Sequence, residues 1–174
     1  MPEIEIKTEG GESDPRGQKV GVLAAVLAVI LAVVSIASHR AHTLAVVERS
    51  EANDQWSFYQ SKRIKFHSLE LGADLVNLLG TGKPGAAEAV ARYEQEEKKY
   101  EKDSKQVEEK AKELEAETSH IEDQALRYDI GEGMLEIGVV LASLYFIARR
   151  RLFPIVSLTF GVLGIAIAIS GALM

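Results

Sequence analysis

Three acidic side chains stand close together at the start of an apolar stretch in the second half of the chain. Glu132 and Glu136 are four residues apart, and Asp129 precedes Glu132 by three, so a helix places all three on one face. A carboxylate inside a bilayer is costly unless it meets protein, water or a cation, and such residues commonly mark functional sites. In an oligomer, a ring of these glutamates would resemble the mouth of a cation-selective pore.

The two glutamates also have a purely structural interpretation. If the membrane-spanning segment starts only near Met134, Glu132 lies among lipid headgroups and pairs with Arg127 or with Arg40 of a neighbouring copy. We favour this interpretation for Glu132. Glu136 lies one turn deeper, and both interpretations stay open for it.

Three of the four histidines are candidates for a metal site. His39 and His42 are three residues apart, and an antiparallel pairing of the chain's two charged arms brings His120 within about a turn of His42. Imidazoles together with a carboxylate bind zinc or another transition metal. The positions of these histidines along the arms do not all agree, however. We therefore favour polar contacts between helices, and we predict no cofactor.

The Gly82-Lys83 pair invites comparison with a phosphate-binding loop. That motif requires a glycine five residues before the pair and Ser or Thr directly after the lysine, but Asn77 and Pro84 occupy these positions. The sequence also lacks a Ser-His-Asp ordering and an HExxH motif. We therefore interpret residues 80–85 as a tight reversal of the chain, and we expect no enzyme activity.

The composition narrows the class of protein. Among the 174 residues, 47% are hydrophobic and 26% are charged, and the two kinds are segregated in blocks. The formal net charge of -6 argues against a nucleic-acid partner, which needs a basic patch. The absence of cysteine excludes disulfides and thiolate metal sites.

Three apolar blocks are long enough to span a bilayer: residues 20–37, 130–148 and 153–174. A cleaved signal peptide is disfavoured for the first block, because the tail at residues 1–19 is long and acidic rather than short and basic. We expect that tail to be disordered and cytoplasmic. The turn at residues 149–152 holds Arg149, Arg150 and Arg151, which also places it in the cytoplasm. The C-terminus then lies on the periplasmic side.

The segment between the first two blocks, residues 38–129, reads as a periplasmic helical hairpin with two arms of nearly equal length. Side chains at alternating spacings of three and four along residues 86–128 predict a helix that packs on one partner helix, as in a coiled coil. Acid-before-base pairs such as Glu101–Lys105 and Glu108–Lys112 support it from the solvent side. The predicted hairpin core consists of Trp56, Tyr59, Phe66, Tyr93, Tyr100, Val107, Leu114 and Ile121.

The third apolar block carries small residues at spacings of three and four, namely Gly161, Gly164, Ala168 and Gly171. Such residues let helix backbones approach closely in lipid. They cover more of the helix surface than one neighbour would use. This argues for self-association through these four residues.

The block Asn53-Asp54-Gln55-Trp56-Ser57-Phe58-Tyr59-Gln60-Ser61-Lys62 resembles a bacterial family catalogued as a domain of unknown function, numbered four-three-three-seven. The shared features are this block, a single N-terminal span, a charged helical middle and two closing spans. The resemblance implies a bacterial inner-membrane protein and supplies no activity.

The sequence therefore predicts an all-α protein with three transmembrane helices and a long extramembrane hairpin. The expected function is a non-enzymatic homo-oligomeric scaffold or adaptor that presents a coiled-coil stalk. The alternative is an oligomeric ion channel lined by the second span, with Glu132 and Glu136 at its mouth. The expected partners are the lipid bilayer, further copies of the chain, and another membrane or periplasmic protein.

Overall fold

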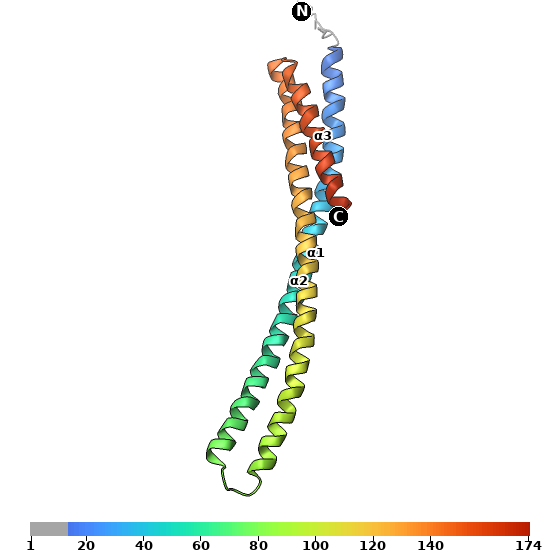
Figure 1. Ribbon diagram of the computed structural model, residues 1–174. Coiled ribbons are helices and arrows are strands. Elements are labelled where there is room, and N and C mark those ends of the chain that lie inside the picture. The colour runs from blue at the N-terminus through green and yellow to red at the C-terminus, as the bar shows by residue number, and fades with distance from the viewer. Residues whose placement is uncertain (1–13) are drawn as a thin grey trace, which may run out of the picture. The chain divides into compact units, whose positions relative to one another are not determined.

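The computed structural model describes residues 14–174, which form three α-helices (Figure 1): α1 (Pro15–Leu79), α2 (Ala86–Ala148) and α3 (Leu152–Ala172). The predicted all-α architecture is confirmed for these residues. Each helix contains a segment long and apolar enough to cross a membrane, which indicates a membrane protein. The predictions for residues 1–13 lie outside the described part of the chain.

The chain divides into two compact units, and α1 and α2 contribute to both. Unit 1 contains the described residues up to Ser38 together with Leu126–Met174, and unit 2 contains His39–Ala125. Each unit buries its own set of small and apolar side chains. We describe them separately.

The start of α1 corrects the predicted boundary of the polar tail, because residues 15–19 are helical. The Asp14 side chain caps the helix, with its Oδ1 atom accepting a hydrogen bond from the Arg16 backbone N–H at 3.1 Å. The Gly17 backbone N–H also binds this carboxylate and lowers the pKa of Asp14. Pro15 occupies the first helical position, where its missing N–H carries no penalty. The Asp-Pro pair is thus a start signal that the prediction of a continuous tail overlooked.

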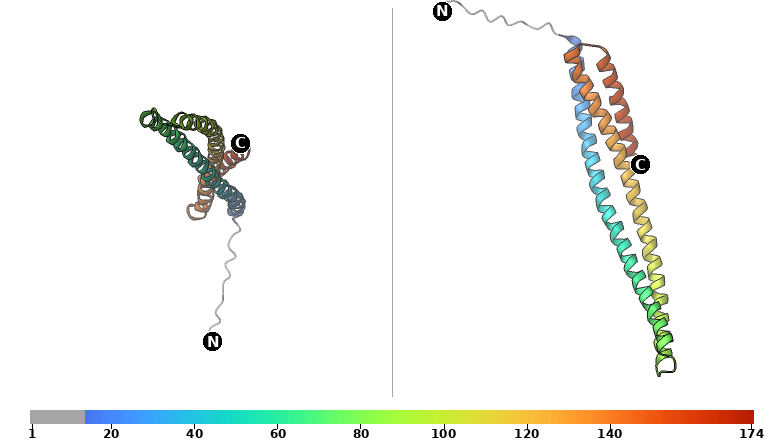
Figure 2. Two further views of the ribbon diagram at one scale, coloured as in Figure 1. Left: turned by 90° about the horizontal axis from the view of Figure 1, so that it is seen from below. Right: turned by 90° about the vertical axis from the view of Figure 1, so that its left-hand side faces the viewer.

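Unit 1 is a packed set of three helical segments. The α2 segment runs antiparallel to both α1 and α3, and the right-hand view of Figure 2 shows α3 beside the C-terminal part of α2. The main core cluster contains Leu27, Val34, Leu135 and Ala168. A hydrogen bond from Ser157 Oγ to the Gly138 carbonyl, at 2.7 Å, joins α3 to α2 in its interior. The Ser157 side chain is fully buried, so this bond satisfies a hydroxyl that cannot reach water.

Unit 2 is a pair of antiparallel helical arms joined by the turn at residues 80–85 (Figure 1). Lys62 Nζ lies 3.2 Å from Asp103 Oδ2 across the pair, and a Cβ added at Gly72 would lie 3.3 Å from the Tyr93 ring. The well-buried side chains are mostly small, because they occupy the line along which the arms approach: Ala41, Ala45, Ala52, Ala73, Ser104, Ala111, Thr118, Ile121 and Ala125.

Of the predicted hairpin core, only Ile121 is buried, whereas the other seven side chains are half-buried: Trp56, Tyr59, Phe66, Tyr93, Tyr100, Val107 and Leu114. These residues flank the line of small side chains and cover it from the solvent. The arms thus have a thin core, in which close backbone approach replaces bulky apolar packing.

Ion pairs support α2 from its solvent side. Lys105 Nζ lies 2.7 Å from Glu101 Oε1, and the hydrogen bond between them lowers the pKa of Glu101. Lys112 Nζ lies 2.6 Å from Glu108 Oε1, which raises the pKa of Lys112. All of these groups are solvent-exposed or nearly so, so each pair contributes little on its own.

We expect acidification to weaken the arms in part through Glu101. Its pKa is lower in the folded than in the unfolded state, so its ion pair stabilises the fold above the unfolded pKa, and this contribution disappears as the pH falls through the folded pKa. The measurement is the melting temperature by circular dichroism at neutral pH and at about pH 3. On acidification, the melting temperature of Glu101→Gln should fall by less than that of the wild type. In the control Glu96→Gln, which changes an exposed carboxylate, the melting temperature should fall as much as in the wild type. An equal fall in all three proteins would contradict the contribution assigned to Glu101.

Candidate functional site

Polar side chains at one end of unit 1 are largely satisfied within the chain. Ser38 Oγ donates a hydrogen bond to Asp129 Oδ1 at 2.7 Å, which joins α1 to α2. Arg127 Nη1 donates to Ser170 Oγ at 3.2 Å, which joins α2 to α3. The arginine that the headgroup interpretation assigned to Glu132 is therefore bonded to α3 instead.

Glu136 has no hydrogen-bond or ion-pair partner among the described residues, and its side chain is exposed on the outer face of α2. Its depth follows from Gly138, two residues or about 3 Å further along the helix. A Cβ added at Gly138 would lie 3.5 Å from Leu27 Cδ1 and 3.2 Å from the Ser157 carbonyl oxygen. Leu27 is near the middle of the first apolar block. Glu136 is thus level with the centre of the apolar helices rather than with their edge.

Glu132 lies one turn nearer to the edge of the apolar segment and is half-buried. It also has no hydrogen-bond or ion-pair partner among residues 14–174. A charged side chain at the centre of a bilayer is unfavourable by about 2.5–3.5 kcal/mol on insertion scales. That penalty applies to Glu136 much more than to Glu132. Glu136 is therefore the side chain of unit 1 that most needs a partner outside the chain.

The arginine turn lies at the opposite end of unit 1. Arg149, Arg150 and Arg151 are all exposed, and Arg149 adopts a left-handed backbone conformation with φ of 50°. Its guanidinium Nη1 lies 3.8 Å from Asp14 Oδ2, and the Tyr145 hydroxyl donates to the same oxygen at 3.4 Å. The acidic cap of α1 thus meets the basic turn at this end.

The small residues of α3 correct the predicted oligomer interface. Gly161, Gly164, Ala168 and Gly171 are all buried inside the single chain. A Cβ added at Gly161 would lie 2.5 Å from Leu27 Cδ2. The three helices of one chain therefore occupy the small-residue face, because two neighbouring helices approach it rather than the one that the prediction assumed. These four residues are therefore not accessible to a second copy.

The histidines do not form the site that their spacing allows. His39, His42 and His120 are exposed, and each has contacts within the chain. Among residues 14–174, no group of three or more His, Asp or Glu side chains lies close enough together to hold a metal ion.

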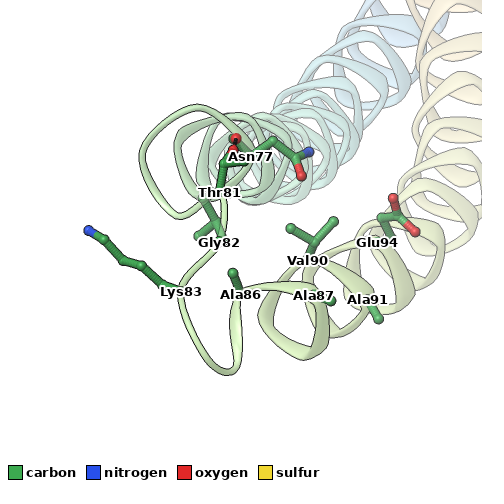
Figure 3. A pocket seen from close by; sticks show the side chains of 10 residues that line it. Asn77, Thr81, Gly82, Lys83, Ala86, Ala87, Val90, Ala91 and Glu94 are labelled. Carbon is green, nitrogen blue, oxygen red and sulfur yellow. Dashed lines mark hydrogen bonds between the residues drawn. The ribbon is translucent and has the colours of Figure 1, made fainter.

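At the tip of the arms, residues of the turn, α1 and α2 line an open hollow of about 450 Å³ (Figure 3). Some of the turn's backbone amides are used within the turn: the Gly80 N–H donates to the Val76 carbonyl at 2.7 Å, and the Lys83 N–H donates to the Gly80 carbonyl at 2.9 Å. Gly82 and Gly85 supply the two positive φ angles, 79° and 83°, that the reversal requires. Figure 3 shows Lys83 pointing away from the hollow. The geometry agrees with a helix reversal and not with a phosphate cradle.

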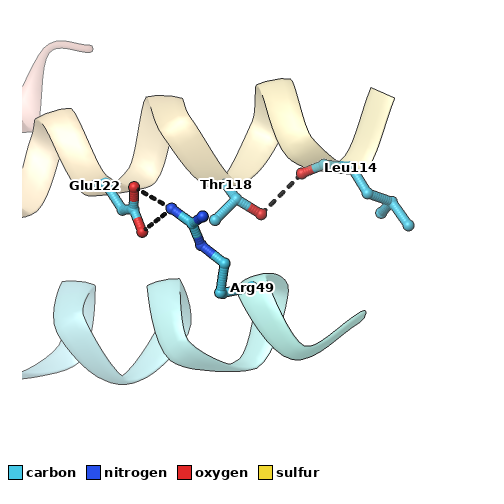
Figure 4. A network of polar contacts seen from close by, with 4 residues as sticks. All are labelled: Arg49, Leu114, Thr118 and Glu122. Atoms are coloured by element: carbon cyan, nitrogen blue, oxygen red, sulfur yellow. Dashed lines mark hydrogen bonds and ion pairs between the residues drawn. The ribbon is translucent and has the colours of Figure 1, made fainter. Parts of the chain in front are cut away.

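Arg49 of α1 forms an ion pair with Glu122 of α2 (Figure 4). Its Nη2 atom lies 2.5 Å and 2.6 Å from the two carboxylate oxygens of Glu122. One turn away on α2, the buried Thr118 hydroxyl donates to the Leu114 carbonyl at 2.8 Å. The first contact joins the two arms, whereas the second lies within α2 and satisfies a buried hydroxyl.

The packing at small residues predicts that alanine substitutions at two glycines of unit 1 change its stability by different amounts. A Cβ at Gly164 would lie 2.8 Å from the Gly131 carbonyl oxygen, whereas one at Gly133 meets nothing within 4 Å. Gly164→Ala should therefore destabilise unit 1 by about 1–3 kcal/mol. Gly133→Ala should be neutral, or stabilising by up to about 1 kcal/mol. Thermal unfolding in detergent measures both, and equal effects would contradict the described packing.

A family model described as a domain of unknown function (DUF4337) matches residues 16–174, nearly the whole sequence. Comparisons with curated proteins and with solved structures give no match. The chain belongs to the DUF4337 family.

Proposed function

We propose that this protein is a non-enzymatic, homo-oligomeric scaffold or adaptor of the bacterial inner membrane. Three helices anchor it, and the arms of unit 2 form a coiled-coil stalk that presents its surface to another protein. The proposed orientation puts the arginine turn in the cytoplasm and the arms in the periplasm, following the positive charge of Arg149, Arg150 and Arg151.

The observation that supports this role is the construction of unit 2. Its two arms bury mainly small side chains between them, and the aromatic residues cover that line from the side. A helix pair of this kind offers a long surface but no enclosed volume in which substrate is shielded from water. Since long helices with few buried large side chains gain stability from packing, further copies would stabilise these arms.

A second candidate function, an oligomeric cation pore lined by α2, rests on Glu136 alone. This exposed carboxylate lies level with the middle of the apolar helices and has no partner among the described residues. A ring of copies would let it face a wet axis instead of lipid. In a scaffold, the same side chain would instead be covered by a neighbouring copy.

Native mass spectrometry of the detergent-solubilised protein, combined with cation flux in proteoliposomes, separates these functions. The scaffold predicts a defined oligomer without flux. The pore predicts an oligomer whose flux is lost in Glu136→Gln and kept in Glu96→Gln, a control at an exposed position of the arms. A monomer at all accessible concentrations would contradict both functions.

A further inference from the structure

The outer faces of the two arms differ in chemistry. On the α2 arm, the described residues 86–125 expose no large apolar side chain, and the surface consists chiefly of Glu and Lys. On the α1 arm, five aliphatic side chains of the distal half are exposed: Leu79 (70%) at the end of the helix, and the four residues Ile64 (67%), Leu71 (59%), Leu75 (47%) and Leu78 (78%). If both outer faces of a helix pair contact only water, both are expected to be polar.

These four residues follow the spacing of a second packing line. Ile64, Leu71 and Leu78 are seven residues apart, and Leu75 lies between the last two at the three-and-four spacing. Phe66 and Ala73 belong to the contact between α1 and α2. Ile64 precedes Phe66 by two positions, and Leu71 precedes Ala73 by two positions. That is about 200° around a helix, so the aliphatic line lies on the side of α1 opposite to α2. Serines occupy the other positions of the line: Ser57 and Ser61 precede Ile64, and Ser68 lies between Ile64 and Leu71.

We propose that this line, residues 57–78 of α1, is the surface through which a second copy of the chain binds, with the two α1 arms parallel and in register. The proposal rests on the proposed function, because copies anchored in one membrane share an orientation and meet side by side. Parallel pairing about a two-fold axis then places each residue opposite itself. The line covers about three heptads, and the shared membrane raises the effective concentration of the second arm.

The charges of the two outer faces favour α1 over α2 as the self-association surface. When identical residues face each other, the lysines and glutamates of the α2 arm meet like charges, whereas the α1 line contains only aliphatic and serine side chains. Beside the α1 line, parallel pairing would put Gln60 against Lys65 of the second copy and Asp74 against its Leu79. Neither pair brings like charges together.

Single introduced thiols test the surface directly, because the natural chain contains no cysteine. We compare Leu75→Cys with Ala91→Cys, a matched exposed position on α2. The contact between Gly72 and Tyr93 puts these two positions at nearly the same level along the arms. In native membranes, a short bis-maleimide should link Leu75→Cys into a dimer at least about tenfold more efficiently than Ala91→Cys.

The mass of the full-length protein provides a second readout. The double substitution Leu71→Glu/Leu78→Glu changes only exposed side chains and should reduce the oligomer to smaller species. The control Ala87→Glu/Ala91→Glu, also at exposed positions, should leave the oligomer unchanged. Circular dichroism verifies that both variants keep their helices.

Four results would overturn the proposed surface. Equal linking at Leu75→Cys and Ala91→Cys, or an unchanged oligomer in Leu71→Glu/Leu78→Glu, would place the contact between copies elsewhere while leaving the oligomeric scaffold intact. Linking of Leu75→Cys to a different protein would assign the surface to another partner. A monomeric wild type would contradict the oligomer itself, and with it both proposals.

Discussion

Close approach of helix backbones at small residues is the contact on which unit 1 depends. In lipid, association of helices gains little from the hydrophobic effect, so van der Waals packing and hydrogen bonds must hold the segments together. Gly164 lies so near to Gly131 that a single added methyl group would meet its carbonyl oxygen at 2.8 Å. The Ser157 hydroxyl uses the same proximity to reach the Gly138 carbonyl. Because this face is filled from inside the chain, the proposed contact between copies is placed on another surface.

In unit 2, small residues also allow two helices to approach closely, but here the helices are rich in charged residues. Alanine, serine and threonine bring the arms together, but they bury little apolar surface, and the larger side chains remain half-exposed. Helical propensity and exposed ion pairs add little to so thin a contact. The outer faces of the arms are chemically unequal: that of α2 is chiefly charged, and that of α1 carries exposed aliphatic residues. This asymmetry is the basis for proposing α1 as the surface that a second copy binds.

Most of the architecture could be predicted from the sequence, because apolar runs and the spacing of three and four are local signals. They indicated the helices, the turn at residues 80–85 and the arginine turn between α2 and α3. The helix start at Pro15 was also readable from Asp14 and Pro15, but the acidic composition of the tail concealed it. The sequence could not predict which helix packs against each small residue. A glycine such as Gly161 can pack equally well against a neighbouring copy or against Leu27 of its own chain, and the structure shows Leu27. The depth of Glu136 likewise became clear only from the packing of Gly138 against Leu27 and Ser157.

The central claim is that the apolar helices cross the bilayer and leave the arms on one side of it. Labelling of single cysteines with a membrane-impermeant maleimide, in sealed vesicles of both orientations, tests this claim most directly. Lys83→Cys reports on the tip of the arms, and Arg150→Cys reports on the arginine turn. The two positions should be labelled from opposite sides, with Arg150→Cys reached from the cytoplasmic side. Labelling of both from the same side would contradict this claim.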